Sequence, residues 1–165
     1  MPVFSEDLAA DITRRYGAPV QMMQLKQGMF DEATISVIAL ETIHEIARLA
    51  GQSPDVRRYR PNIAVRLFRP GSFQEDAWLG STLSFGERDD DAPAVAVTMR
   101  DERCSMVNLD PETASSTPEM MKAVVRANQN HAGIYGTVIR TGQVAVGQPI
   151  FLHGASERRE HATGK

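Results

Sequence analysis

The spacing of apolar residues along the chain predicts three helices. Residues 4–17 place Leu8 and Ile12 on one face and carry acidic residues in the first turn, where they complement the positive end of the helix dipole. A second helix, with apolar residues at helical spacing, ends at Gly51. The third is expected within residues 116–133, where a proline near the start and a glycine at the end mark its limits.

Shorter apolar and alternating runs predict a larger number of strands. β-branched residues precede the second helix, and several other runs are bounded by glycine or proline. These strands are expected in residues 20–25, 62–69, 80–86, 92–100 and 134–152, the last of which holds two or three strands with a Thr-Gly turn. Helices and strands do not alternate regularly, so a Rossmann-like sheet is not expected. We expect an α+β fold that is mainly β, an antiparallel barrel, closed or partly closed, with flanking helices.

The length and the apolar content indicate one domain with a tail. The 165 residues are 42% hydrophobic, which suffices for a packed core. We expect a single domain over residues 1–153 and a disordered, polar tail over residues 154–165. The chain shows no leader pattern and no apolar run of about 18 residues, so we expect no membrane association and a reducing, cytoplasmic location. The pattern identifies no interface between copies, so it leaves the oligomeric state open.

The charged residues exclude some partners and favour others. A net charge of −3, with no basic domain, argues against nucleic-acid binding. Arginine supplies all but three of the 18 basic residues. Arginine suits bidentate binding of phosphate or carboxylate, although a GC-rich genome gives the same bias. None of the three lysines, Lys26, Lys122 and Lys165, lies in a recognisable Schiff-base setting, so pyridoxal phosphate is not expected on this chain alone.

The segment "DVRRYRPN", residues 55–62, contains the first candidate anion site. A residue before proline is held extended, and in an extended run Arg58 and Arg60 would face one way with Tyr59 facing the other. Two guanidinium groups on one side could bind a phosphate. The alternative is that they form surface ion pairs, for example with Asp55.

Two further groups of polar residues favour structural roles. Glu75 and Asp76 precede the only tryptophan, and adjacent carboxylates on a strand point apart, so a paired acid–base site is not indicated. We expect Trp78 to be a core anchor and the two acids to complete a turn or hold arginines. The histidines show no HExxH spacing.

Cys104 is the only cysteine, which excludes an intramolecular disulfide and a cysteine-cluster metal site. A lone cysteine is commonly a small buried apolar residue. Arg103 and Arg100 nevertheless lie close in sequence, and nearby cations favour the thiolate, the form that attacks, carries sulfur or binds metal. The residues alone therefore leave a core, a redox and a ligand role open.

Taken in order, these motifs resemble the MOSC domain, the C-terminal domain of molybdenum cofactor sulfurases that also occurs in the mitochondrial amidoxime reducing component. The resemblance runs from about Ser5 to Leu152. It rests on the segments "FDEATISVIALETI", "RRYRPNIAV", "FQEDAWLGSTLSFG", "RDERCSMVNLDPET" and "GIYGTVIRTGQVAVGQPIFL".

The resemblance implies a β-barrel and a site for molybdenum cofactor. Cys104 matches the family's cysteine, which binds molybdenum or carries sulfur. Arg60 and Asn62 match positions that line the pterin and its phosphate, while Arg103 flanks the metal ligand and Asp31 lies in a segment that borders the same pocket. The cofactor brings its own dithiolene, so one protein thiolate suffices. Amidoxime-reducing members have a longer N-terminal segment, and serine where this chain has Glu102.

Three hypotheses follow for the function. In the first, the protein holds molybdenum cofactor through Cys104 and reduces an N-oxygenated substrate with electrons from separate proteins. In the second, Cys104 carries sulfur as a persulfide received from a cysteine desulfurase. In the third, the barrel is a binding module without chemistry. The location of the Cys104 sulfur relative to Arg60 and Asn62 bears on all three.

Overall fold

The computed structural model describes residues 6–21, 33–86 and 91–154. The chain divides into two compact units, Met1–Asp31 and Glu32–Lys165. In the first unit, helix α1 (Glu6–Tyr16) confirms the predicted N-terminal helix. Residues 20 and 21 are not part of a strand, and the rest of the strand expected over residues 20–25 lies outside the described residues, as does the tail beyond residue 154.

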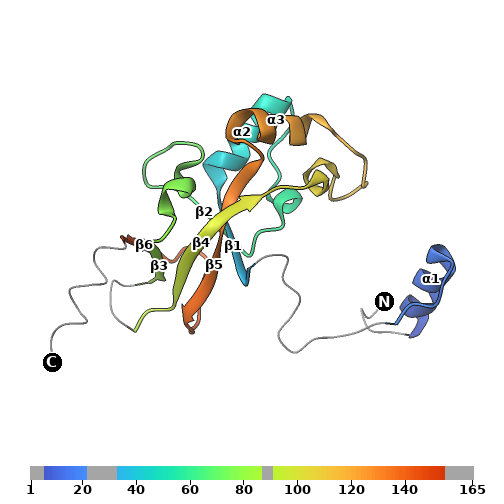
Figure 1. Ribbon diagram of the computed structural model, residues 1–165, viewed down its shortest axis with the longest axis horizontal. Coiled ribbons are helices and arrows are strands. Elements are labelled where there is room, and N and C mark those ends of the chain that lie inside the picture. Colours follow the sequence, from blue (N-terminus) through green and yellow to red (C-terminus); the bar gives the residue numbers. More distant parts are fainter. Residues whose placement is uncertain (1–5, 22–32, 87–90, 155–165) are drawn as a thin grey trace. The chain divides into compact units, whose positions relative to one another are not determined.

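The second unit is built on a six-stranded mixed sheet. Its strands occur in the order β2-β1-β5-β4-β3-β6, with β1 and β2 parallel and every other pair antiparallel. Figure 1 shows the long strands β4 and β5 crossing the middle of the unit. The strands are β1 (Ile35–Ala39), β2 (Ile63–Val65), β3 (Thr82–Phe85), β4 (Ala94–Glu102), β5 (His131–Arg140) and β6 (Ile150–His153).

The sheet is an open half-barrel, so the α+β class and the partly closed alternative are confirmed, whereas the closed alternative is wrong. The sheet is also mixed, because β1 and β2 are parallel. Register shifts within the β4–β5 pair bend the sheet. In the described part of the chain, the short strands β2 and β6 are the two edge strands of the sheet, so each pairs with one neighbour only. The β1–β2 pair is parallel because a helix crosses between the two strands.

Helices α2 (Leu40–Ala50) and α3 (Glu119–Asn128) pack together at one end of the sheet (Figure 1). Gly51 ends α2 in the left-handed conformation, as expected. The third helix stops before Gly133, because Gln129 and Asn130 both take positive φ, and Gly133 lies inside β5 instead. The described residues of this unit also form three short 3-10 helices: η1 (Val56–Tyr59), η2 (Gln74–Trp78) and η3 (Ser105–Asn108).

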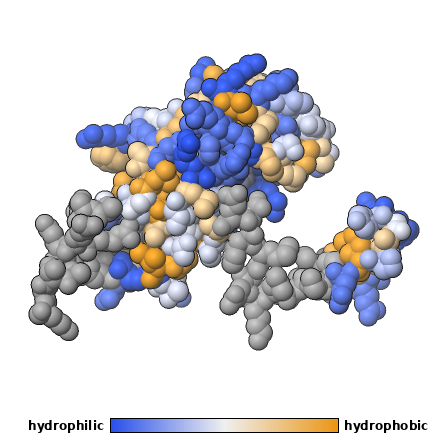
Figure 2. Space-filling view, viewed as in Figure 1, coloured by the Kyte–Doolittle hydropathy of each residue, from blue (hydrophilic) through white to orange (hydrophobic). Residues whose placement is uncertain are grey.

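The strand expectations were too long at both edges of the sheet. Only Ile63–Val65 of residues 62–69 form a strand, and residues 141–149 separate β5 from β6 without one. Several apolar side chains of the strands are exposed, including Val138 and Ile139 of β5 and Leu152 of β6. Figure 2 shows apolar surface on the part of the second unit below its helices. In the segments that the structure describes, each helix is too short or too polar to traverse a bilayer.

The core of the second unit has two parts, one on each face of β1. Ile38 packs with residues of α2 and α3, whereas its neighbour Val37 packs with residues of the other strands. Successive side chains on a strand point to opposite faces, so one strand serves both clusters. Half-buried Trp78 packs against the second cluster, in agreement with its expected anchoring role.

A buried carboxylate joins the start of α2 to η2. Glu75 is fully buried, and its two oxygens accept hydrogen bonds from the Ala39 N–H at 3.2 Å and the Thr42 hydroxyl at 2.9 Å. Ala39 has no side chain that could cap the helix, so Glu75 satisfies the helix terminus from a distant segment. Its negative charge also lies at the favourable end of the helix dipole.

The Glu75 carboxyl makes stability depend on pH. Burial raises its pKa above the usual value of 4.5. The protonated carboxyl therefore stabilises the fold below the unfolded pKa, and this stabilisation is lost as pH rises through the folded-state pKa. We expect Glu75→Gln, which cannot ionise, to gain stability relative to the wild type as pH rises above the unfolded pKa, in urea unfolding experiments. Glu75→Ala should lose about 2–4 kcal/mol, because two buried donors lose their acceptors.

Glu119→Gln is the matched control. Glu119 is an exposed first-turn carboxylate whose pKa is lowered, chiefly by its own backbone N–H. Its stabilisation exists above the unfolded pKa and is lost as pH falls, so this variant should lose stability relative to the wild type as pH rises. The same trend in both variants would contradict the assignment.

Candidate functional site

Cys104 lies on the surface, directly after β4 and at the start of η3. Its side chain is exposed, whereas Arg103 before it and Val107 and Asn108 after it are buried. The interpretation of Cys104 as a small core residue is therefore wrong. Among the described residues, His, Cys, Asp and Glu form no group of three that could hold a metal ion.

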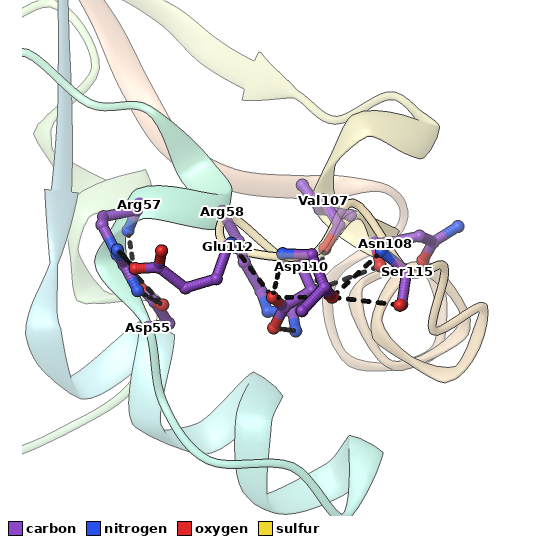
Figure 3. Close-up of polar contacts among 9 residues, drawn as sticks. Asp55, Arg57, Arg58, Val107, Asn108, Asp110, Glu112 and Ser115 are labelled. Carbon is purple, nitrogen blue, oxygen red and sulfur yellow. Dashed lines mark hydrogen bonds and ion pairs between the residues drawn. The ribbon is translucent and has the colours of Figure 1, made fainter.

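Arg58 fastens η1 to the segment that follows Cys104. Its guanidinium Nη1 donates to the Asn108 carbonyl at 3.1 Å, and Nη2 pairs with the Asp110 carboxylate at 3.1 Å (Figure 3). Asp110 also accepts the N–H groups of Thr113 and Glu112, and these bonds lower the pKa of its carboxyl. Because Arg58 is buried, its charge interacts with Asp110 and the Asn108 carbonyl, and these contacts join η1 to the segment after η3.

The expectation that Arg58 and Arg60 share one side of an extended run is wrong. Residues 56–59 form a 3-10 helix, because the Asp55 carboxylate accepts the Arg57 N–H at 2.9 Å and starts a turn. Figure 3 shows Asp55 paired with Arg57 as well. The helical turn buries Arg58 and leaves Arg60 exposed.

Arg60 adopts a strained backbone conformation at the end of η1. Its φ of 49° and ψ of 42° are left-handed, and its N–H donates to the Arg57 carbonyl at 3.2 Å. This conformation costs a residue with a side chain about 1–2 kcal/mol. The next residue is Pro61, which disfavours helical conformations at the position before it. Strain at an exposed arginine indicates that its surroundings hold it in place.

Asn62 is fixed by Ser36 at the start of β1. Its side-chain oxygen accepts the Ser36 N–H at 2.8 Å and faces the Ser36 hydroxyl at 3.1 Å. Because a backbone N–H can only donate, the acceptor must be Oδ1, and this fixes the orientation of the amide. The Nδ2 group of Asn62 donates no recorded hydrogen bond within the described part of the chain, and the residue is exposed.

Arg103 is buried, although its neighbour in sequence, Cys104, is exposed. Its Nε donates to the Ala132 carbonyl at 2.7 Å, its Nη1 donates to the Tyr59 carbonyl at 2.8 Å, and its Nη2 lies 2.6 Å from the Asp101 carboxylate. Its guanidinium also lies over the Tyr59 ring, 5.5 Å from the centroid. Burial lowers the pKa of Arg103, and the charge of Asp101 opposes that shift.

The remaining candidate residues are Glu102, Asp31 and Asp76. Glu102 is exposed and accepts a hydrogen bond from the Asn130 amide at 3.0 Å. Asp31 lies outside the described residues. Asp76 accepts the Asn128 amide at 2.8 Å and pairs with Arg100 at 3.6 Å, which confirms that the two acids of η2 serve structure.

Sequence reasoning missed Asp101 and Ser36. Asp101 could have been found, because it lies two residues before Arg103, and residues two apart on a strand share a face. Ser36 gave no signal, since its contact with Asn62 spans segments far apart in the sequence.

Comparisons with known proteins agree with this architecture. The MOSC domain family model matches residues 13–151. The crystal structure of YuaD from Bacillus subtilis aligns with a TM-score of 0.59 and 23% identity, covering 76% of this chain and 66% of that one. YiiM from Geobacillus stearothermophilus aligns with a TM-score of 0.55 and 19% identity, covering 73% of this chain and 54% of that one. At these identities the likeness shows the fold alone.

The chain thus spans just under two thirds of the length of YuaD and about half that of YiiM. A comparison with curated proteins finds no matching sequence.

The contrast between Arg58 and Arg60 gives a prediction about stability. Arg58→Gln removes a buried cation from Asp110, so it should lower the free energy of unfolding by about 2–4 kcal/mol. Arg60→Gly should leave stability unchanged or raise it by up to about 1 kcal/mol, because glycine adopts the left-handed conformation without a Cβ penalty. Urea unfolding measures both. A large loss in Arg60→Gly would mean that the Arg60 side chain is itself structural.

Proposed function

This chain belongs to the MOSC domain family, and from that premise we propose that it binds molybdenum cofactor through Cys104. MOSC domains are associated with this cofactor in general. The observation that carries the proposal is the exposed sulfur of Cys104, at a junction where η1 and η3 are fastened together next to the exposed Arg60.

The donors at this junction fit the chemistry of the group. A thiolate can ligate molybdenum, and a single one suffices where the pterin dithiolene supplies other sulfur ligands. The phosphate of the cofactor needs cationic and N–H donors. The exposed Arg60 guanidinium and the outward amide nitrogen of Asn62 are of these kinds. Arg58 and Arg103 are occupied by protein contacts, so we do not include them among the groups that would bind the phosphate.

The proposed reaction is the reduction of an N-oxygenated substrate. The N–O bond breaks, two electrons and two protons are consumed, and the oxygen leaves as water. When bound, the molybdenum centre would supply the change of oxidation state, while the protein positions it. Electrons would come from a separate electron-transfer protein. Cys104 would hold the centre, and Arg60 and Asn62 would orient its phosphate.

Metal content tests the proposal. Protein purified from a host that makes molybdenum cofactor should carry close to one molybdenum per chain by elemental analysis. Cys104→Ser should lose almost all of it, because the hydroxyl is a poor ligand for this soft site. Arg60→Gln should lose a part, because the phosphate would lose a charge-assisted contact.

Ser105→Ala is the matched control, since Ser105 is the exposed neighbour of Cys104. It should keep its molybdenum. Wild-type protein without molybdenum from a competent host would overturn the proposal, as would equal metal content in the wild type and Cys104→Ser.

Sulfur transfer is the second candidate, and it is favoured by the exposure of the Cys104 sulfur. A partner protein must reach the sulfur directly, which a buried site would prevent. The Cys104 thiolate would attack the terminal sulfur of a persulfide on a cysteine desulfurase. A new S–S bond forms on Cys104 as the desulfurase thiolate leaves, so there is no net redox change.

Intact-mass spectrometry distinguishes this function. Incubation with a cysteine desulfurase and free cysteine should add the mass of one sulfur atom to the wild type, and a reducing agent should remove it. Cys104→Ser should gain nothing. An unchanged wild-type mass would exclude the carrier function, and with a negative metal analysis it would favour a binding module without chemistry.

A further inference from the structure

We propose that Arg103 is a positioning residue, which with Asp101 fixes the backbone that presents Arg60 next to Cys104. The guanidinium of Arg103 would then not touch the bound group. The inference rests on the proposed function only for the identity of what binds at this surface. Four observations support it.

The first is that each nitrogen of the Arg103 guanidinium faces an oxygen inside the protein, Nε and Nη1 in hydrogen bonds and Nη2 in an ion pair. Its three nitrogens contact three different segments: Nε reaches the Ala132 carbonyl in β5, Nη1 the Tyr59 carbonyl at the end of η1, and Nη2 the Asp101 carboxylate in β4. The side chain is only 8% exposed. A ligand that used this guanidinium would have to displace an interaction already formed in a buried site.

The second is the alternation of buried and exposed residues that brings Asp101 and Arg103 together. Asp101 and Arg103 are two residues apart and both are buried, whereas Glu102 and Cys104 are exposed. Side chains therefore alternate between the two faces at the end of β4 and just beyond it, so that the ion pair points inward and the thiol points outward. The Asp101 carboxylate is almost completely buried, and the Arg103 guanidinium at 2.6 Å provides its counter-charge.

The third is the space that the guanidinium occupies. Gly133 has a φ of +90°, and a Cβ at this position would lie 3.2 Å from Nη2 of Arg103 and 2.7 Å from the Val37 carbonyl. Any other residue would therefore meet both the guanidinium and the β1 backbone. A glycine inside β5 is what lets Arg103 reach across the strand.

The fourth is the peptide between Tyr59 and Arg60. Its carbonyl accepts Nη1 of Arg103 at 2.8 Å, and its N–H donates to the Arg57 carbonyl at 3.2 Å. With both ends bonded, the plane of this peptide is fixed, and that plane sets the φ of Arg60. Arg103 thus stabilises the left-handed conformation that directs the Arg60 side chain.

Thiol reactivity tests the inference without the cofactor. Cys104 reacts with 5,5′-dithiobis(2-nitrobenzoate), a dianion, and with neutral 2,2′-dithiodipyridine by the same exchange chemistry. A guanidinium near the sulfur favours the thiolate for both reagents and attracts the anionic reagent in addition, so the ratio of the two rates reports on the charge of Arg60. We expect Arg60→Gln and Arg103→Lys each to lower this ratio about three- to tenfold at low salt.

The double variant identifies the route of the effect. If Arg103 acts through Arg60, then Arg103→Lys should change the ratio in the wild type and leave it unchanged in the Arg60→Gln background. Arg69→Gln, which removes an exposed arginine from the loop after β2, should keep the wild-type ratio. An unchanged ratio in Arg60→Gln, or additive effects in the double variant, would overturn the inference.

A measurement on the unmodified protein covers the case in which Arg103→Lys does not fold. The side-chain Nε–H of Arg103 should exchange with water at least about tenfold more slowly than that of Arg60, as followed by NMR, because it is buried and bonded. Fast exchange at Arg103 would overturn the inference. The molybdenum analysis is separate, so a protein without metal can still show the protected Nε–H and the altered rate ratio.

Discussion

The candidate site depends on one guanidinium, that of Arg103, which binds three segments of the chain at once. Arg103 joins the end of β4 to β5 and to η1, and it does so from a position next to the only cysteine in the chain. A lysine could not make these contacts, because a single ammonium lacks the planar arrangement of donors that reaches three acceptors at once. The backbone next to Cys104 is therefore held by Arg103, a side chain that is itself buried.

Two other buried ionisable side chains among the described residues also bind distant segments of the second unit. Arg58 and Glu75 are buried charged residues from short 3-10 helices, and each satisfies backbone groups of a distant segment. Each ties a loop to the sheet or to a helix that the sheet supports. Short elements such as η1 and η2 have few hydrogen bonds of their own, so these long-range contacts hold them in place. Arg60 and Cys104, by contrast, are exposed and remain available for a ligand.

Sequence reasoning predicted the elements whose signals are local. The periodicity around α2 and its stop at Gly51 were correct, because propensity, pattern and capping agree there. The end of α3 was misplaced, since Gly133 gave a strong local stop signal but serves the packing of Arg103 in β5. The sequence also left closed and partly closed barrels open, and the sheet proved to be an open half-barrel. Closure depends on whether the two edge strands meet, and no pattern within either strand reports that.

The candidate site shows the same limit at the level of single residues. Pattern and resemblance singled out Arg58, Arg60 and Arg103 together, because all three are arginines near short motifs. The structure separates them by burial: two guanidinium groups are engaged by carbonyls and carboxylates, and one is exposed on a strained backbone. An arginine that binds an anionic ligand must keep its donors free, whereas one that orders the backbone must use them. The protein combines both kinds around η1: Arg58 and Arg103 bind its neighbouring segments, and Arg60 at its end stays exposed.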